Sequence, residues 1–334
     1  MPFFRTLAAL AMAAIVQYAP TAKAATPTIT LGFAKCAHCL PMALTPQLAK
    51  GVTIEATPFT SGNDVLTALV SKSIDVAQVT YLHFVTALDK GFDVVAISGQ
   101  VNGGSEMLMA PGVALQGEDW PGLKKLVEER KKAGKPLRVA ASRGNAQDLH
   151  MRGVLAKHGI DPDKDVQFLN IPNPADHAAA LQRGEIDLVS TVEPFASQIR
   201  ITGAGKHFDF PYDQAAGKLT NLIVTRSDVI KNHPQEVQAT VDAVVALVGK
   251  LKTDQQAWVD VITKYTALDP AVAKQALQNA EPDYDMYLKP TLAIAKMMRD
   301  LHYVATDVSA QIPEHMNYDF LSKATGKPKT ELGF

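Results

Sequence analysis

Cysteine is scarce in this chain: only two occur among 334 residues, both in the segment Cys36-Ala-His-Cys39. An excess of one charge is missing too, because 33 basic and 34 acidic residues leave a formal net charge of -1. No basic run is available to neutralise phosphates, so we expect no nucleic-acid partner.

Familiar catalytic motifs are also missing. The sequence contains no phosphate-binding glycine loop, no His-Glu-x-x-His segment and no Ser/His/Asp arrangement. We therefore expect a protein that is not an enzyme and that carries no cofactor.

Long apolar runs are absent beyond residue 25, where no stretch approaches the roughly 18 apolar residues of a membrane span. The beginning of the chain is different. Arg5 precedes an apolar run from Leu7 to Val16, and Ala22-Lys-Ala24 has the small-x-small pattern of a cleavage site. These features predict a secretory signal peptide over residues 1–24 and a mature protein in the periplasm, an oxidising compartment.

Strand-like and helix-like runs alternate through most of the chain, which favours an α/β fold with mostly parallel sheets flanked by helices. The length and the 47% of hydrophobic residues suffice for two domain-sized cores. Segments 71–84 and 182–195 share one construction: a helix end, Ile-Asp, an apolar strand and a polar loop with an aromatic residue. Two lobes of similar build explain this better than one long domain.

The order of these segments resembles the periplasmic substrate-binding proteins of ABC importers for nitrate, aliphatic sulfonates, taurine and thiamine-pyrimidine precursors. The resemblance lies in the order and spacing of these segments across about 300 residues. The matching pieces are Ile29–Phe33, LTALVSKSIDVAQVT (66–80), LRVAASRGNAQDLHMRGVLAKHGI (137–160), AALQRGEIDLVSTVEPF (179–195) and NLIVTRSDVIKNHPQEVQATVDAV (221–244).

The resemblance implies the type II periplasmic-binding-protein fold, in which two lobes are joined by a double crossover and the ligand lies between them. The crossings are then expected near Met107–Met109 and Thr220–Ile223. Lobe 1 would comprise residues 25–107 and 220–334, and lobe 2 would comprise residues 108–219.

Ligands of open α/β sheets bind outside the carboxyl ends of the strands. Four loops meet that condition: Ala34–Leu40, Thr80–His83, Ser142–Gln147 and Thr191–Phe195. In the third loop a strand leads into a helix start, whose free amides favour anions. The candidate anion-binding residues of this loop are Ser142, Arg143, Asn145 and Gln147; Arg143 can clamp an oxyanion through two bonds, although a solvated arginine beside a helix-capping Asn145 gives the same pattern.

The other loops add candidates with different chemistry. Tyr81 follows a predicted strand and offers a hydroxyl donor, and Glu193 could accept bonds from a polar ligand group or pair with a cation across the lobes. The lobe-1 side of the cleft is expected from Lys35, Cys36 and His38.

The two cysteines allow three interpretations. A Cys36–Cys39 disulfide fits an exported protein. A redox dithiol is typical of thioredoxin-like folds, which need only about a hundred residues and do not match the two-lobed pattern. Metal binding by Cys36, His38 and Cys39 is the third, although no second cluster completes a four-ligand site, so no metal is expected.

These observations predict a monomeric periplasmic receptor that captures a small anion and delivers it to the membrane permease subunits of an ABC importer. Closure of one lobe on the other around the ligand would be the functional motion. The alternative from another class is an exported thiol–disulfide or metal-handling protein centred on Cys36 and Cys39.

Overall fold

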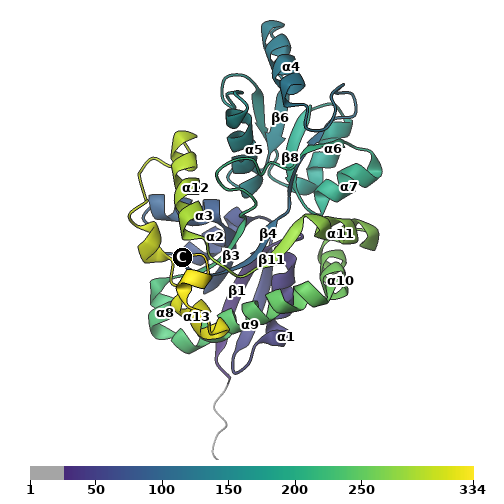
Figure 1. Cartoon of the computed structure of the whole chain (residues 1–334). Helices are drawn as coiled ribbons and strands as arrows, with labels where there is room; N and C mark the ends of the chain where they lie inside the picture. Colours follow the sequence, from purple (N-terminus) through teal and green to yellow (C-terminus); the bar gives the residue numbers. More distant parts are fainter. Residues whose placement is uncertain (1–25) are drawn as a thin grey trace, which may run out of the picture.

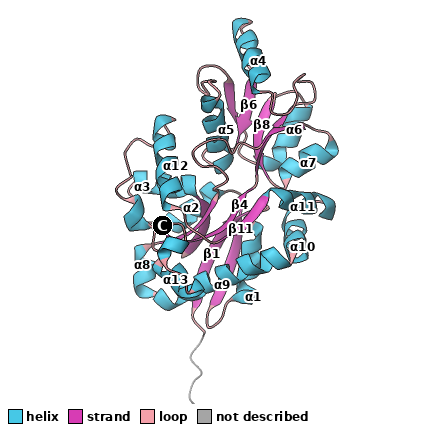
Figure 2. Cartoon of the chain, in the orientation of Figure 1, coloured by secondary structure: helices cyan, strands magenta, loops and turns pink. Residues whose placement is uncertain are grey.

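The computed structural model describes residues 26–334, and the predicted signal peptide (residues 1–24) lies outside them. Within this range the chain forms two mixed β-sheets, each flanked by helices (Figures 1 and 2). No helix of the described residues is long and apolar enough to cross a membrane.

The first sheet has six strands in the spatial order β11-β4-β10-β3-β1-β2. Strands β1, β2 and β3 pair in parallel, whereas β10 is antiparallel to both of its neighbours and β11 is antiparallel to β4. Its strands are β1 (Thr28–Ala34), β2 (Thr53–Phe59), β3 (Val76–Thr80), β4 (Val95–Gly103), β10 (Asn221–Thr225) and β11 (Ala280–Asp283).

The second sheet has five strands in the order β7-β6-β8-β5-β9. Strand β6 is parallel to β7 and β8, and β5 is antiparallel to β8 and β9. Its strands are β5 (Ser105–Met109), β6 (Arg138–Ala141), β7 (Gln167–Asn170), β8 (Leu188–Val192) and β9 (Lys206–Asp209).

The helices form two groups, one beside each sheet (Figure 1). With the first sheet lie α1 (Thr45–Leu48), α2 (Gly62–Val70), α3 (Tyr81–Asp89), α8 (Ser227–Asn232), α9 (Pro234–Thr253), α10 (Gln255–Thr266), α11 (Pro270–Ala276), α12 (Leu288–Asp300), α13 (Asp319–Thr325) and the short 3₁₀ turns η1 (Leu40–Leu44), η3 (Leu277–Asn279), η4 (Ile312–His315) and η5 (Lys329–Glu331). With the second lie α4 (Trp120–Lys132), α5 (Ala146–Lys157), α6 (His177–Gln182), α7 (Phe195–Thr202) and η2 (Pro174–Asp176).

Each sheet has its own apolar core, as expected for two lobes. One buried cluster surrounds the first sheet, with Leu31, Val76 and Ile223 fully buried, and a second surrounds the other sheet, with Leu108 and Val189 fully buried. Strands β3, β5, β8 and β10 are buried at every position. Each combines apolar residues with buried polar ones, such as Gln78 in β3 and Glu106 in β5.

The chain crosses between the sheets twice, and the first crossing differs from the expected place. It lies at Gly103–Gly104, between β4 and β5, whereas Met107–Met109 already belong to the second sheet. Both glycines have positive φ, 87° and 83°. The apolar Met107 run marks the interior of a sheet, and the turn between sheets needs residues without a Cβ. The return crossing leads from β9 to β10 through residues 210–220, whereas residues 221–223 of the expected Thr220–Ile223 already belong to β10.

Gly103→Ala should destabilise the protein because alanine would adopt a positive φ and its Cβ would lie 2.5 Å from the Asn279 carbonyl oxygen. We expect a loss of about 1–3 kcal/mol in the free energy of unfolding, measured by urea titration. Gly112→Ala is the control, because a Cβ at Gly112 would meet no atom within 4 Å. Equal effects of the two changes would contradict the role given to this crossing.

Candidate ligand-binding site

A cavity lies where the carboxyl ends of six parallel strands from the two sheets meet. Its lining comes from the ends of β1, β2 and β3 in the first sheet and of β6, β7 and β8 in the second. The lining residues are Ala34, Lys35, Cys36, His38, Cys39, Thr60, Ser61, Gly62, Gln78, Val79, Thr80, Ser142, Asn145, Gln147, Pro172, Pro174 and Val192. This is the position expected for a ligand of open α/β sheets.

Three helices begin at this cavity. Ser61, Thr80 and Asn145, the N-cap residues of α2, α3 and α5, all line it. The first amide groups of a helix have no partner within the helix and carry its positive partial charge. Among the described residues of the lining there is one cationic side chain, Lys35, and no carboxylate. The cavity therefore favours a negative charge.

Neutral amide side chains supply further donors. Gln78 is 1% exposed, and its two hydrogen bonds, from the Ala34 amide and to the Val79 carbonyl, are both long at 3.5 Å. Gln147 donates to the Ser105 hydroxyl at 3.2 Å. Asn145 caps α5 without a side-chain hydrogen bond to the helix. A ligand in the cavity can thus gain bonds from Gln78 and Asn145 without breaking strong internal ones.

His38 is buried beside these groups, and its imidazole makes no hydrogen bond within the described chain; its Nδ1 is buried and unpartnered. Burial, reinforced by nearby His150, lowers the pKa of His38 to about 3. The imidazole is therefore neutral at physiological pH. In this form one ring nitrogen can donate a hydrogen bond and the other can accept one.

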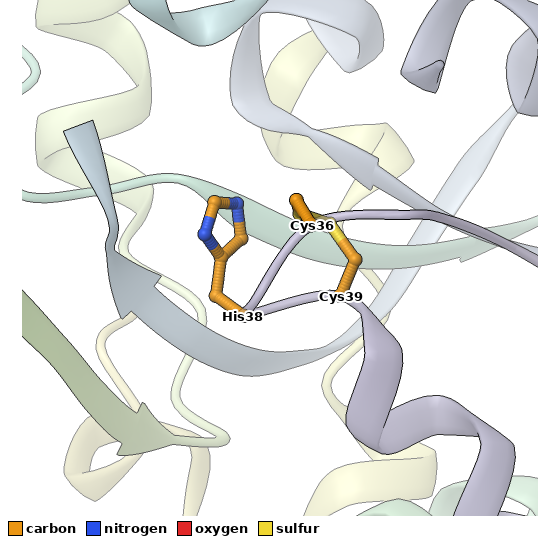
Figure 3. A group of neighbouring side chains, drawn as sticks. All are labelled: Cys36, His38 and Cys39. Carbon is orange, nitrogen blue, oxygen red and sulfur yellow. A yellow bond between two sulfur atoms is a disulfide. The ribbon is translucent and has the colours of Figure 1, made fainter. Parts of the chain in front are cut away.

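The cysteines form a disulfide, as expected: Cys36 and Cys39 are joined on the loop that follows β1, with His38 between them in sequence (Figure 3). Both sulfur-bearing residues are buried, and both line the cavity. The loop is also held from outside. Trp258 Nε1 donates to the Ala37 carbonyl at 2.7 Å, and the Ala37 amide donates to the Glu193 carbonyl at 2.8 Å.

Six of the nine predicted binding residues line this cavity: Lys35, Cys36, His38, Ser142, Asn145 and Gln147. Of these, Ser142 uses its hydroxyl internally, donating to the carbonyls of Ile171 and Pro172. The structure places Tyr81, Arg143 and Glu193 elsewhere.

Tyr81 is turned into the core of the first lobe. Its side chain is 1% exposed, and its hydroxyl accepts a hydrogen bond from the Tyr287 amide at 3.4 Å. The preceding Thr80 lines the cavity instead. Thr80 ends β3 and is the N-cap of α3, whereas Tyr81 is the first residue of that helix, so the change from strand to helix falls between the cavity residue and the core residue.

Arg143 lies outside the cavity, with its side chain exposed on a neighbouring groove. Its backbone is fixed from both lobes: the amide donates to Asn170 Oδ1 at 2.9 Å, and the carbonyl accepts from Asn63 Nδ2 at 3.4 Å. The turn is therefore oriented by its backbone, and the guanidinium does not reach the place where we expected an anion clamp.

Glu193 is fully buried in the second lobe and does not line the cavity. Its carboxylate accepts from the Ser197 amide at 2.9 Å, in the first turn of α7, and lies 3.5 Å from Arg200. Burial, together with the charge of Glu106, raises the pKa of Glu193 to about 7. The group completes a buried charge cluster and is not a ligand contact.

Sequence reasoning missed three parts of the site: Thr60–Gly62, Gln78 and the prolines Pro172 and Pro174. His83 supports this wall from behind, because its ring bonds Thr80 Oγ1 at 2.8 Å and Asn63 Oδ1 at 3.1 Å.

The fold is that of two-lobed solute-binding proteins. Among solved structures, the periplasmic nitrate-binding protein NrtA from Synechocystis PCC 6803 superposes with a TM-score of 0.76 at 17% identity, over 92% of this chain and 91% of that one. The alkanesulfonate-binding protein SsuA from Xanthomonas axonopodis pv. citri gives a TM-score of 0.71 at 19% identity, over 86% and 99%. The predicted periplasmic-binding-protein fold is thereby confirmed.

The chain belongs to the NMT1-like family, whose profile matches residues 22–264. It is 36% identical over 80 residues to the nitrate/nitrite binding protein NrtA of Synechococcus elongatus, a match that covers 24% of this chain and 18% of that protein. It is 30% identical over 129 residues to the bicarbonate-binding protein CmpA of Synechococcus, covering 38% and 27%. The matched segments thus span less than a third of either relative.

Because Glu193 is buried, we expect the free energy of unfolding to depend on pH, and we expect Glu193→Gln to remove this dependence. A carboxyl whose pKa rises from 4.5 to about 7 on folding stabilises the protein fully below pH 4.5, and this contribution is lost as the pH rises through 7. We expect the stability of the wild type relative to Glu193→Gln to fall by about 2–3 kcal/mol between pH 5 and pH 8.

Urea unfolding of both proteins across this pH range measures the difference, in which the contributions of the buried histidines cancel. Glu128→Gln on the exposed face of α4 is the control and should give no such trend. If the difference in stability between wild type and Glu193→Gln is the same at all pH values, the pKa of Glu193 is not raised on folding.

Proposed function

We propose that this protein is the solute-binding component of an ABC importer and that it captures a small anion in the cavity between its lobes. The convergence of three helix N-termini on a lining with one cation and no carboxylate carries this proposal. Such termini bind anions through backbone amides and dipole, without a buried positive side chain.

The size of the cavity favours a small ligand. Its volume is about 50 Å³, a few times the ~10–15 Å³ that one water molecule requires. A compact oxyanion such as nitrate, bicarbonate or a small carboxylate suits this space.

The relatives support the same ligand class. Proteins named as nitrate/nitrite and bicarbonate binding share short stretches of sequence with this chain, and nitrate- and alkanesulfonate-binding proteins share its fold. All of these named ligands are small anions or carry one anionic group. None of the relatives' named functions is catalytic, and we propose none here.

Capture would work by closure of the lobes. Two hydrogen bonds already join them beside the cavity, from the Ala37 amide to the Glu193 carbonyl and from Asn63 Nδ2 to the Arg143 carbonyl. An anion held by Lys35 and Gln78 on one side and by Asn145 and Gln147 on the other would add bonds that exist only in the closed state. The closed monomer would then dock on permease subunits at the periplasmic face of the membrane.

A thermal-shift screen tests the ligand class. Nitrate, nitrite, bicarbonate, formate and methanesulfonate are each added to the full chain at constant ionic strength, with chloride as the reference. A ligand present at 100 times its Kd stabilises the folded state by about 2.7 kcal/mol, so at least one anion should raise the Tm by several degrees. If none does, the proposed ligand class is wrong.

Comparing Lys35→Gln with Arg143→Gln tests whether the anion binds in the cavity or in the neighbouring groove. Both side chains are exposed cations, but only Lys35 lines the cavity. An exposed charge contributes about 0.2–1 kcal/mol to such an interaction, so Lys35→Gln should weaken binding of the stabilising anion up to about fivefold. Arg143→Gln should change it less than twofold in calorimetric titrations. The reverse order would restore Arg143 as the anion clamp.

A further inference from the structure

We infer that the loop at Cys36–Cys39 is a second, redox-controlled site: once the disulfide is reduced, Cys36, His38 and Cys39 bind one thiophilic divalent cation such as Zn²⁺. One potential ligand atom from each of these residues lies within 4.8 Å of the others. Two thiolates and one imidazole are the donors that Zn²⁺ prefers, and two residues between cysteines is a usual ligand spacing. The inference goes beyond the anion site, which uses the oxidised loop.

The state of His38 is the second observation that points to a ligand. Buried polar groups nearly always have a hydrogen-bond partner, yet this imidazole is 2% exposed and makes no hydrogen bond within the described chain. Figure 3 shows the ring standing beside the disulfide, with one nitrogen on the side of Cys36.

The loop keeps its shape without the disulfide, because hydrogen bonds fix it at three points. Trp258 Nε1 bonds the Ala37 carbonyl at 2.7 Å, Asn221 Nδ2 bonds the His38 carbonyl at 3.3 Å, and the Ala37 amide bonds Glu193. All three bonds involve the backbone of the two residues between the cysteines. Reduction therefore leaves two thiols held near each other and near His38.

The chemistry balances with an external dithiol as the reductant. The dithiol passes two electrons and two protons to the Cys36–Cys39 bond, which becomes two thiols while the dithiol becomes a disulfide. The cation then displaces the two thiol protons to water. The complex of a divalent cation with two thiolates is neutral overall, so it does not leave a net charge in this buried place. All three donor residues line the cavity, so the ion can enter through it.

The test uses Cd²⁺ as the probe, because its bonds to thiolates give a charge-transfer band in the ultraviolet. The full chain is compared in oxidised form and after reduction by a phosphine, which is itself oxidised to the phosphine oxide with oxygen from water. We expect one Cd²⁺ per reduced chain with the thiolate band, and no binding above background in the oxidised chain. Zn²⁺ should displace the probe competitively.

Variants assign the ligands. His38→Ala should weaken Cd²⁺ binding at least tenfold, and the double change Cys36→Ser with Cys39→Ser should abolish it. His233→Gln, an exposed histidine far along the chain, should leave binding unchanged. Circular dichroism and thermal melting of each reduced protein establish that it remains folded.

Three results would overturn the inference. The first is a folded, reduced protein that binds no Cd²⁺, the second is a His38→Ala variant that binds as tightly as the wild type, and the third is unfolding of the chain on reduction. Binding of equal strength in the oxidised protein would likewise place the ion elsewhere.

Discussion

The double crossing of the chain is the constraint on which the rest of this structure depends. Strand β10 arrives from the second lobe and lies between β3 and β4, and strand β5 arrives from the first and lies between β8 and β9. Each sheet is therefore completed by a strand from the far side of a crossing. As a result the carboxyl ends of the parallel strands in both sheets face one shared space, and every loop that leaves those ends borders it.

The electrostatic character of the cavity follows from that geometry. In a βα unit the loop after a strand leads to a helix N-terminus, so facing strand ends bring several N-termini together. Here α2, α3 and α5 supply them, and no carboxyl group belongs to the described lining: Asp64 and Asp148 lie in the first turns of α2 and α5 outside it, and Glu193 and Glu106 are buried with Arg200. In the proposed function these backbone dipoles would supply much of the attraction for an anion, and the described lining adds one cationic side chain, Lys35.

Much of this arrangement could be predicted from the sequence, because it rests on local patterns. Apolar runs followed by polar loops located the strand ends, and four of the six cavity loops were found in this way. The loop after β2 and the loop after β7, which carries Pro172 and Pro174, were not among the loops expected to border the cavity. The prediction placed the first crossing near Met107–Met109 and not at Gly103–Gly104, because an apolar run marks a buried strand and not the turn that leads into it.

Side-chain directions could not be predicted, because they depend on contacts between segments distant in sequence. Thr80 ends β3 opposite Asn221 of β10 and lines the cavity, whereas Tyr81, the first residue of α3, packs in the core of the first lobe. Arg143 points outward because Asn170 and Asn63 hold its backbone from two lobes. Glu193 caps α7 through Ser197, which a sequence pattern does not distinguish from a free carboxylate in a cleft.

The cysteine loop, residues 36–39, contacts elements of both lobes. It follows β1 at the centre of the shared space, and its backbone is bonded to α10 through Trp258, to β10 through Asn221 and to the second lobe through Glu193. A loop fixed at so many points does not require a covalent link to keep its shape. The disulfide at the cavity wall separates the two proposed sites: the proposed anion site uses the oxidised loop, and the proposed cation site beside His38 requires both sulfur atoms as free thiolates.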